Sequence, residues 1–493
     1  MNPQDAEDGT TDSMTVTVPG RGLVKVTINT IAMEEKAQAA RAVYELSRAM
    51  GASFGEWLQP SMDVFLPLVS FEYSADVRST AAQTLSAIYD AACAHGEQTG
   101  NMQLPQHYLP LLSKAISNQV VQESPTDLEN LYALGDSLSE VFYIVSRYPT
   151  YRSDLLAKYT MTNAKESVDA CLAAFKLCLH RRAKITRVLA GQLTGEDEME
   201  EYKDLLLQEE NLLTPIVDSL GYNLKFFRHE FLPLFDQKIV PVIAPYLASL
   251  SDVRSTIAAM LLFDDCVEHC GPEAAATYAP QLLQGILLAF SSSSDEKDLI
   301  QGAVYGVMQI ARKAPNAISM DNFMVIVQKL LQLTSRRKEA ESNNEYLLEI
   351  SCSALASLTL FGRFSDVKCI PRETLLQSFV AQLPIQQDDD EAKVCHAQFC
   401  TLFDTDSATL LSPAYVPHMI HIIATILSDV DNDEDVATPE TIERFKTILF
   451  QMEQSVPAST LQQAFGALDG DTQNIVNIAI GEAAHSRSNL ITP

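Results

Sequence analysis

Candidate helix starts recur at a regular interval in the second half of the sequence. They fall near residues 251, 295, 341, 389 and 435, which places successive starts 44 to 48 residues apart. An interval of this length is typical of helix-pair repeats, in which each pair buries its apolar faces against the pairs before and after it. The period therefore predicts a stacked array of helices rather than a chain folded around one central core.

The clearest single repeat lies between residues 251 and 292. Ser251–Cys270 and Glu273–Phe290 are each predicted to form a helix, because apolar residues recur at helical spacing in both. Gly271-Pro272 separates them, since glycine is favoured just past a helix end and proline at the first position of the next helix. Two amphipathic helices joined by so short a turn form a hairpin that needs neighbouring copies to cover its apolar faces.

We predict an all-α fold, a right-handed superhelical HEAT-repeat solenoid of about nine helix pairs, over residues 31–485. Repeats are expected to start near residues 31, 74, 127, 203, 251, 295, 341, 389 and 435. Residues 1–30 are expected to form a disordered tail and a short β-hairpin around Pro19-Gly20-Arg21-Gly22. Residues 486–493 are expected to form a second tail.

A short charged pattern opens two of the expected repeats. Ser74-Ala75-Asp76-Val77-Arg78 and Ser251-Asp252-Val253-Arg254-Ser255 each place an aspartate and an arginine two residues apart at a helix start. Aspartate there favours the helix N-terminus and its dipole, and the arginine can reach an acid in a neighbouring repeat. Ladders of this kind are characteristic of HEAT repeats.

One predicted helix is much longer than its neighbours. Ala164–Thr194 carries the basic patch His180-Arg181-Arg182-Ala183-Lys184 together with Arg187, and an acidic run, Glu196–Glu201, follows it in a predicted loop. The acidic loop either neutralises the basic helix, or competes with or captures a basic ligand.

Composition excludes several classes of function. The net charge is −29, from 64 acidic and 35 basic residues. A charge of this sign repels nucleic acid and anionic membranes and attracts basic partners, although it also serves the solubility of an elongated protein. No apolar run reaches the roughly 18 residues of a membrane span, and the N-terminus lacks the apolar centre of a secretory signal. We therefore expect neither nucleic acid nor membrane as a partner.

No pattern in the sequence predicts catalysis or a bound cofactor. We find neither a glycine-rich phosphate loop nor a G-x-S-x-G motif, so we expect no enzyme and no cofactor. Nine cysteines are scattered over predicted helix faces, as expected for reduced thiols. Cys266/His269/Cys270 and Cys395/His396/Cys400 lack a second ligand pair at zinc-finger spacing, so we expect core side chains there and no metal.

The sequence Leu262–Cys270, LFDDCVEHC, is similar to the FDD-x-x-EHC segment of the karyopherin-β (importin-β) family, in its importin-five or karyopherin-β-three branch. Other stretches that resemble this branch occur in the family's order and cover almost the whole chain: Met33–Ala37, Phe231–Pro233, Pro241–Ile243, Gln301–Val307 and Ala381–Pro384. Since a full receptor has about twenty HEAT repeats, the resemblance implies the C-terminal half of such a receptor.

The resemblance implies a nuclear import receptor that works as a monomer in the cytoplasm, the nucleus and the nuclear pore. Such receptors bind basic cargo, with its nuclear localisation signals, on the inner layer of second helices. They bind phenylalanine–glycine nucleoporins between outer helices, and the GTPase Ran releases the cargo. Ran would bind mainly through the other half of the receptor. The alternative is a HEAT-repeat scaffold that holds partner proteins constitutively, as phosphatase scaffolds and assembly factors do.

Acidic residues on the repeats are the candidates for cargo binding. Asp264, Asp265 and Glu268 on the helix Ser251–Cys270 either bind cargo lysines or form a structural ladder to an adjacent repeat, for example to Arg254 or to an arginine of the next hairpin. The remaining candidates share a place on predicted second helices: Asp63, Glu166, Asp169, Asp236 and Glu373. Trp57, the one tryptophan, either offers lysine stems an aromatic platform or packs within the first hairpin.

Overall fold

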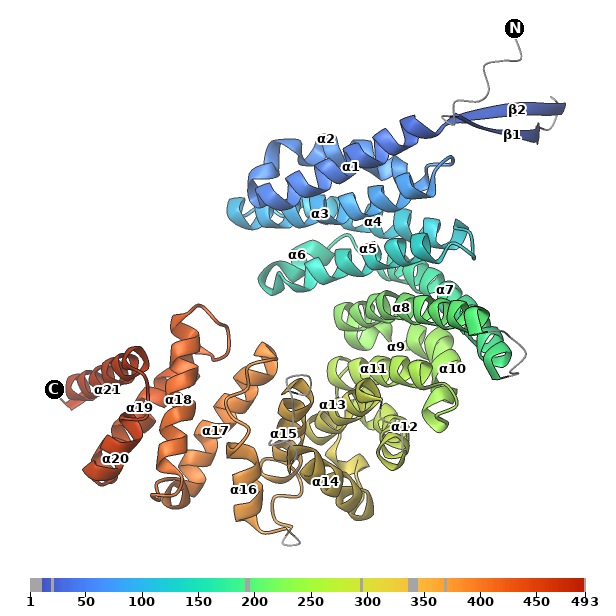
Figure 1. The fold of residues 1–493 in the computed structure, drawn as a ribbon. Helices are drawn as coiled ribbons and strands as arrows, with labels where there is room; N and C mark the ends of the chain where they lie inside the picture. Colours follow the sequence, from blue (N-terminus) through green and yellow to red (C-terminus); the bar gives the residue numbers. More distant parts are fainter. Residues whose placement is uncertain are drawn as a thin grey trace. The chain divides into compact units, whose positions relative to one another are not determined.

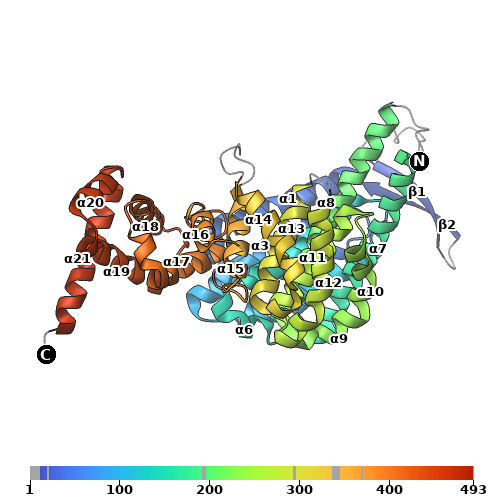
Figure 2. The same ribbon diagram turned by 90° about the horizontal axis from the view of Figure 1, so that it is seen from below.

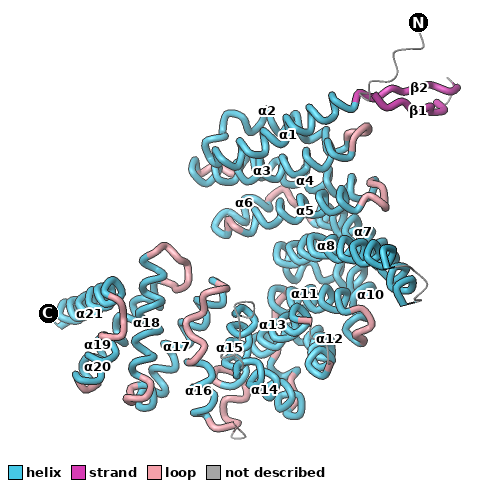
Figure 3. Tube along the Cα trace, viewed as in Figure 1, coloured by secondary structure: helices cyan, strands magenta, loops and turns pink. Residues whose placement is uncertain are grey.

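The computed structural model describes residues 11–18, 22–190, 196–292, 296–335, 345–367 and 370–491. It divides into two compact units, one of residues 1–246 with 251–274 and one of residues 247–250 with 275–493. Among the described residues the only β structure is an antiparallel hairpin of β1 (Thr11–Val18) and β2 (Gly22–Asn29), drawn in magenta in Figure 3. Thr11 lies opposite Asn29, and Val18 lies opposite Gly22.

Helices of the first unit pack in two layers (Figure 1). The first-helix layer stacks in chain order and consists of α1 (Thr30–Met50), α3 (Ala75–Thr99), α5 (Leu128–Ser146), α8 (Glu196–Phe227) and α11 (Val253–His269). The second-helix layer consists of α2 (Leu58–Phe65) with η2 (Leu66–Ser70), α4 (Gln103–Gln122) and α7 (Met161–Ala190). The predicted all-α HEAT-repeat solenoid is therefore confirmed.

Local capping explains where these helices begin and end. The side chain of Ser74 accepts a hydrogen bond from the amide of Val77 at the start of α3, and Asp252 accepts one from Ser255 at the start of α11. Gly271 has a φ of +93°, a conformation that favours glycine, and it ends the turn before α12 (Pro272–Ser291). The turn predicted at Gly271-Pro272 is thus present, and the ends of both flanking helices fall within two residues of those predicted.

The charged patterns at the helix starts form ion pairs between repeats. Arg41 of α1 contacts Asp76 of α3 at 2.9 Å, and Arg254 of α11 lies 3.4 Å from Glu210 of α8. Within one repeat, Arg78 holds Glu123 with two hydrogen bonds of 2.8 and 2.6 Å. The pair of Arg254 with Glu210 is the contact between repeats that the pattern predicts, whereas Arg78 finds its acid within its own repeat.

The acidic run Glu196–Glu201 is not a loop, because it forms the first turns of α8, a helix of 32 residues. Carboxylates are favoured at a helix N-terminus, where they face the positive end of the dipole. The preceding helix α7 ends at Ala190, and the predicted residues 191–194 lie outside the described residues. Figure 2 shows that the ends of α7 and α8 that flank this segment extend beyond the neighbouring helices.

The second helix of the fourth repeat is broken into short pieces. These are η4 (Arg228–Phe231), α9 (Leu232–Leu234), the π-helical η5 (Phe235–Ile239), α10 (Val240–Ile243) and η6 (Ala244–Ala248). Pro233 and Pro241 fall at the starts of α9 and α10, where the missing amide hydrogen of proline costs no helical hydrogen bond. Shorter irregular pieces elsewhere in the unit are η1 (Gly51–Trp57), η3 (Pro149–Tyr151) and α6 (Arg152–Leu156).

The second unit continues the helix-pair pattern after α12. Its remaining helices are α13 (Lys297–Lys313), η7 (Pro315–Ala317), α14 (Met320–Ser335), α15 (Glu345–Thr359), α16 (Arg372–Val380), α17 (Asp389–Leu410), α18 (Val416–Asp431), α19 (Pro439–Ser455), α20 (Ala458–Phe465) and α21 (Gly470–Ile491). The first helices α13, α15, α17 and α19 pack in chain order. A segment with non-helical backbone at Asp406 interrupts α17 near its end.

A half-buried arginine joins three first helices of the second unit. Arg312 of α13 donates two hydrogen bonds, of 3.0 and 2.6 Å, to the carboxylate of Glu391 on α17. The same guanidinium also donates to the hydroxyls of Ser357 and Ser353 on α15, which lies between α13 and α17 in the chain, at 3.0 and 2.9 Å. Glu391 is 6% exposed, so the carboxylate of this pair is buried while the guanidinium of Arg312 stays partly exposed.

Candidate functional site

Three of the predicted cargo-binding acids lie on the second-helix layer beside cations or hydroxyls. Asp63 of α2 is exposed, and the hydroxyl of Tyr108 donates to its carboxylate at 3.3 Å. Asp169 of α7 is exposed and contacts Lys238 of η5. The lysine lies on an adjacent repeat, so this acid is partly neutralised by the protein itself.

Glu166 lies one turn before Asp169 on α7 and is only partly exposed. Lys114 of α4 lies 3.9 Å from one carboxylate oxygen of Glu166, and the other oxygen is buried without a hydrogen-bond partner. Asp236 is exposed on η5. Glu373 is exposed in the first turn of α16, which belongs to the second unit. The structure therefore does not gather all the predicted acids into one site.

Asp264 is not available for cargo, because it is 1% exposed. Neither of its carboxylate oxygens has a hydrogen-bond partner. Burial raises the pKa of Asp264 well above its ordinary value, and the nearby charges of Asp265 and Glu268 raise it further. The predicted ladder from Asp264 to Arg254 is also wrong, since Arg254 lies beside Glu210 instead.

Asp265 forms a contact between α11 and α8. Its carboxylate lies 3.4 Å from the ammonium of Lys225, and 3.9 Å from the imidazole of His269 on the following turn. Burial raises the pKa of Asp265 while Lys225 opposes the rise. A Cβ at Gly221 of α8 would meet this carboxylate, so a larger residue there would displace the Asp265 side chain. Glu268, one turn from Asp264, is 25% exposed at its side chain and lies 3.7 Å from His269.

Two arginines of the basic patch of α7, Arg181 and Arg182, pair with acids of α8 and α11. Arg181 holds Glu209 of α8 through two hydrogen bonds, one of which is 2.9 Å long. Arg182, which is 6% exposed, donates to Asp252 at 2.9 Å and lies 3.4 Å from Glu210. These partners lie near the middle of α8 and at the start of α11. The patch is therefore part of the packing between helices.

Trp57 does not pack within the first hairpin, since 58% of its surface is exposed. It lies at the end of η1, and Val64, also 58% exposed, follows seven residues later on α2. Residues seven apart share one face of a helix. Trp57 and Val64 are thus two exposed apolar side chains on the same short stretch of chain as the exposed carboxylate of Asp63.

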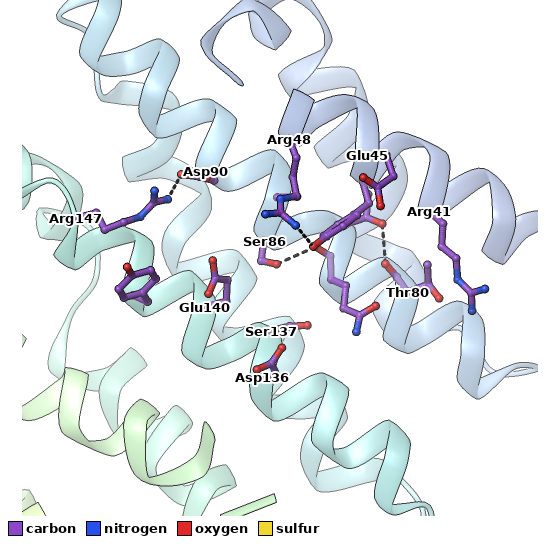
Figure 4. Close-up of a pocket in the computed structure, with 15 residues that line it drawn as sticks. Arg41, Glu45, Arg48, Thr80, Ser86, Asp90, Asp136, Ser137, Glu140 and Arg147 are labelled. Carbon is purple, nitrogen blue, oxygen red and sulfur yellow. Dashed lines mark hydrogen bonds and ion pairs between the residues drawn. The ribbon is translucent and has the colours of Figure 1, made fainter. Parts of the chain in front are cut away.

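The structure also contains a groove that the sequence did not predict. It has a volume of about 670 Å³ and is formed by α1, α3 and α5 of the first-helix layer (Figure 4). We call it the first-layer groove, and its charged and tyrosine lining is Arg41, Tyr44, Glu45, Arg48, Asp90, Asp136, Glu140, Tyr143 and Arg147. The ion pair of Asp90 with Arg147 marks one end of the groove, and Arg41 lies at the other.

The cysteines and histidines that could suggest a metal site are engaged in packing. Eight described cysteines are free and buried. His396 has both ring nitrogens occupied: Nδ1 lies 2.8 Å from the carbonyl of Val436, and the amide of Ile385 donates to Nε2 at 3.2 Å. Over the described ranges, no three His, Cys, Asp or Glu side chains are placed to share a metal ion, and no helix is long and apolar enough to cross a membrane.

Comparison with known proteins shows which solved structures have a similar fold. No family model matches the sequence. The chain is similar to Kap121p in its crystal structure bound to Ste12p, with a TM-score of 0.69 and 16% identity over 97% of this chain. It is also similar to Kap121p bound to Nup53p, with a TM-score of 0.68 and 16% identity over 97%, and to Kap121p bound to RanGTP, with a TM-score of 0.65 and 16% identity over 96%.

These likenesses define the class of fold, a karyopherin-β-like HEAT-repeat solenoid. The chain spans 39% to 40% of the length of Kap121p in these three structures. The matched Kap121p structures are those bound to Ste12p, to Nup53p and to RanGTP.

Proposed function

We propose that this chain is part of a nuclear transport receptor of the importin-five or karyopherin-β-three branch, and that it binds basic cargo segments on its second-helix layer. The observation that carries the proposal is the exposed surface of Trp57 and Val64 beside Asp63, on a karyopherin-β-like fold. The segment LFDDCVEHC on α11 and the net charge of −29 also support it.

Charge alone would not hold such a cargo. Each exposed ion pair contributes only about 0.2–1 kcal/mol, because water and salt screen it. An exposed tryptophan adds apolar contact, since the aliphatic stem of a lysine can pack on the ring while its ammonium reaches a carboxylate. The surface of Trp57, Val64 and Asp63 offers both contributions within two turns of chain.

We further propose that the receptor is a monomer, that it also binds phenylalanine–glycine nucleoporins, and that it moves between cytoplasm and nucleus through the nuclear pore. Ran would act mainly through repeats beyond this chain, which spans about two fifths of the length of Kap121p. This function consists of binding, without a catalytic step.

The test is a titration of this chain with a lysine-rich nuclear-localisation peptide at low and at physiological salt. We expect binding that weakens with salt, that falls in Trp57→Ala, and that falls in Asp63→Asn combined with Asp169→Asn. The matched control is Glu34→Gln combined with Glu35→Gln, which removes the same charge from exposed positions on α1. Absence of binding at either salt concentration would refute cargo binding by these repeats and favour the scaffold function.

A further inference from the structure

Helix α1 lies at one end of the first-helix layer and carries an exposed row of apolar residues (Figure 1). The row repeats every three or four positions and has one polar member: Ile31, Glu35, Ala39, Ala42, Leu46 and Met50. We call this row the α1 stripe. Its spacing places all six side chains on one face of the helix. Single exposed apolar residues are ordinary, whereas a continuous apolar row is a common sign of a surface that another protein segment covers.

The opposite face of α1 packs on α3. Its buried residues are Ala37, Ala40 and Ser47, about half a helical turn from the α1 stripe. The hydroxyl of Thr84 donates to the carbonyl of Ala40 at 3.1 Å, and Nδ1 of His95 lies 3.0 Å from the carbonyl of Ala52, just past the end of α1. Both contacts join positions 43 or 44 residues apart, so α1 and α3 run in the same direction.

Helix α3 shows how a first helix inside the layer uses its faces. Thr84, which bonds to α1, is buried, and so are the residues one and two turns away on the same face, Val77, Ala81 and Ile88. An internal helix therefore buries the face that looks back towards the preceding first helix. On α1 the corresponding face is the exposed α1 stripe, so α1 has the residue pattern of an internal helix.

The last helix, α21, has a different pattern. In its described part most exposed side chains are polar, with Ile478 as the exception: Asp471, Asn474, Asn477 and Glu482. Terminal repeats of an array carry a polar outer face, which keeps the array soluble. The apolar row is thus particular to α1 and is not shared by the exposed side of every helix in the chain.

We propose that the α1 stripe packs against the first helix of a further HEAT pair, which is supplied by repeats of the receptor beyond this chain and runs parallel to α1. Such a helix would continue the contact that already joins α1 to α3 and α3 to α5. The inference rests on the proposed function, in which this chain is one part of a longer receptor, and the chain spans only 40% of the length of Kap121p. Trp57 and Val64 lie on the second-helix layer, so they remain available to cargo.

The probe is a fluorescent peptide with the sequence of α1, Thr30–Met50, because a helix that precedes α1 would present the kind of face that α1 presents to α3. A side-chain link between positions 34 and 38, which lie off that face, keeps the peptide helical, since a helix of this length is only marginally stable alone. Titration of the full chain, followed by fluorescence anisotropy, should show saturable binding.

Leu46→Asp in the full chain should weaken binding of the peptide by about 10- to 150-fold, the range that corresponds to burying one leucine side chain. Leu46 is 54% exposed, so thermal melting of this variant should match that of the parent. The matched control is Ile478→Asp, which makes the same kind of change at a residue of α21 that is 53% exposed and should leave binding unchanged.

Trp57→Ala separates this inference from the proposed cargo site. It should leave binding of the helical peptide unchanged while it weakens binding of the lysine-rich peptide, because the two peptides occupy different layers. Failure of one titration therefore does not decide the other.

Four results would overturn the inference. Absence of binding to the parent would mean that the α1 stripe accepts no helix. Equal weakening in Ile478→Asp, or equal binding of a peptide with the same residues in scrambled order, would mean general apolar attraction. Undiminished binding in Leu46→Asp would mean that the peptide replaces α1 on α3. Sedimentation of the parent as a dimer that Leu46→Asp dissociates would make a second copy of this chain the occupant.

Discussion

His396 makes the stability of the second unit depend on pH. The side chain is fully buried on α17, and its Nε2 accepts a hydrogen bond from the amide of Ile385 while Nδ1 lies 2.8 Å from the carbonyl of Val436. This pattern requires a neutral ring with hydrogen on Nδ1. Protonation of Nε2 would remove the acceptor and place a charge in an apolar interior, and burial accordingly lowers the pKa of His396 from 6.5 to about 4.

The sign and size of the effect follow from these two pKa values. Above about pH 6.5 the imidazole of His396 is neutral in both the folded and the unfolded chain, so its full contribution to stability is present. Between about pH 6.5 and 4 the unfolded chain takes up a proton that the folded chain does not, so stability is lost as the pH falls. The total loss is about 3 kcal/mol, of which about 2 kcal/mol is reached by pH 5.

The assay is urea unfolding of the parent chain and of His396→Asn at about pH 7.5 and pH 5. Asparagine keeps a donor towards Val436 and does not titrate in this range. We expect the parent to lose about 2 kcal/mol more than the variant on acidification. His421→Asn, at an exposed position on α18, is the matched control and should lose as much as the parent. An equal loss in the parent and in His396→Asn would refute the reasoning.

Three further predictions concern single side chains, each measured by urea or thermal unfolding. Glu391→Ala should destabilise the second unit by about 1.5–3 kcal/mol, because the half-buried guanidinium of Arg312 loses its charged hydrogen-bond partner, whereas Glu391→Leu combined with Arg312→Met should cost less. Asp264→Leu should stabilise the chain by about 1–3 kcal/mol, since it removes a buried carboxylate without a hydrogen-bond partner. This gain should grow as the pH rises above the ordinary pKa of aspartate, because the raised folded-state pKa makes the parent lose stability in that direction; a gain that shrinks with rising pH would contradict the assignment. Arg41→Ala should cost less than about 1 kcal/mol, because its pair with Asp76 is exposed, and a larger loss would mean that the ladder carries more stability than its exposure suggests.

Features set by neighbouring residues could be predicted from the sequence. The hairpin at Gly271-Pro272 is an example, because a cap, a glycine and a proline act over a few residues of chain. The acidic run Glu196–Glu201 shows the limit of local reasoning. Its charge suggested a loop, whereas its place before a long apolar pattern makes it the favourable N-terminus of a helix.

Features set by stacking could not be predicted. Arg181 and Arg182 pair with Glu209 and Glu210 of α8, each 28 residues further along the chain, although other acidic residues lie closer in the sequence. The first-layer groove takes its lining from three helices that meet only when consecutive repeats pack. The exposure of Trp57 likewise depends on which face of η1 the second helices leave open. Periodicity identifies the apolar stripe of a helix, but it does not say which polar residues face each other across two repeats.

The bridge from Arg312 past α15 to Glu391 limits how this part of the chain can change its length. In most arrays each repeat touches only its nearest neighbours, so a gene can gain or lose one repeat and still encode a continuous stack. Here the guanidinium of Arg312 on α13 pairs with the carboxylate of Glu391 on α17, which belongs to the repeat after the next one. A duplication or deletion of the helix pair between them would leave a charge without its counterpart. The three repeats would therefore have to be inherited as a block.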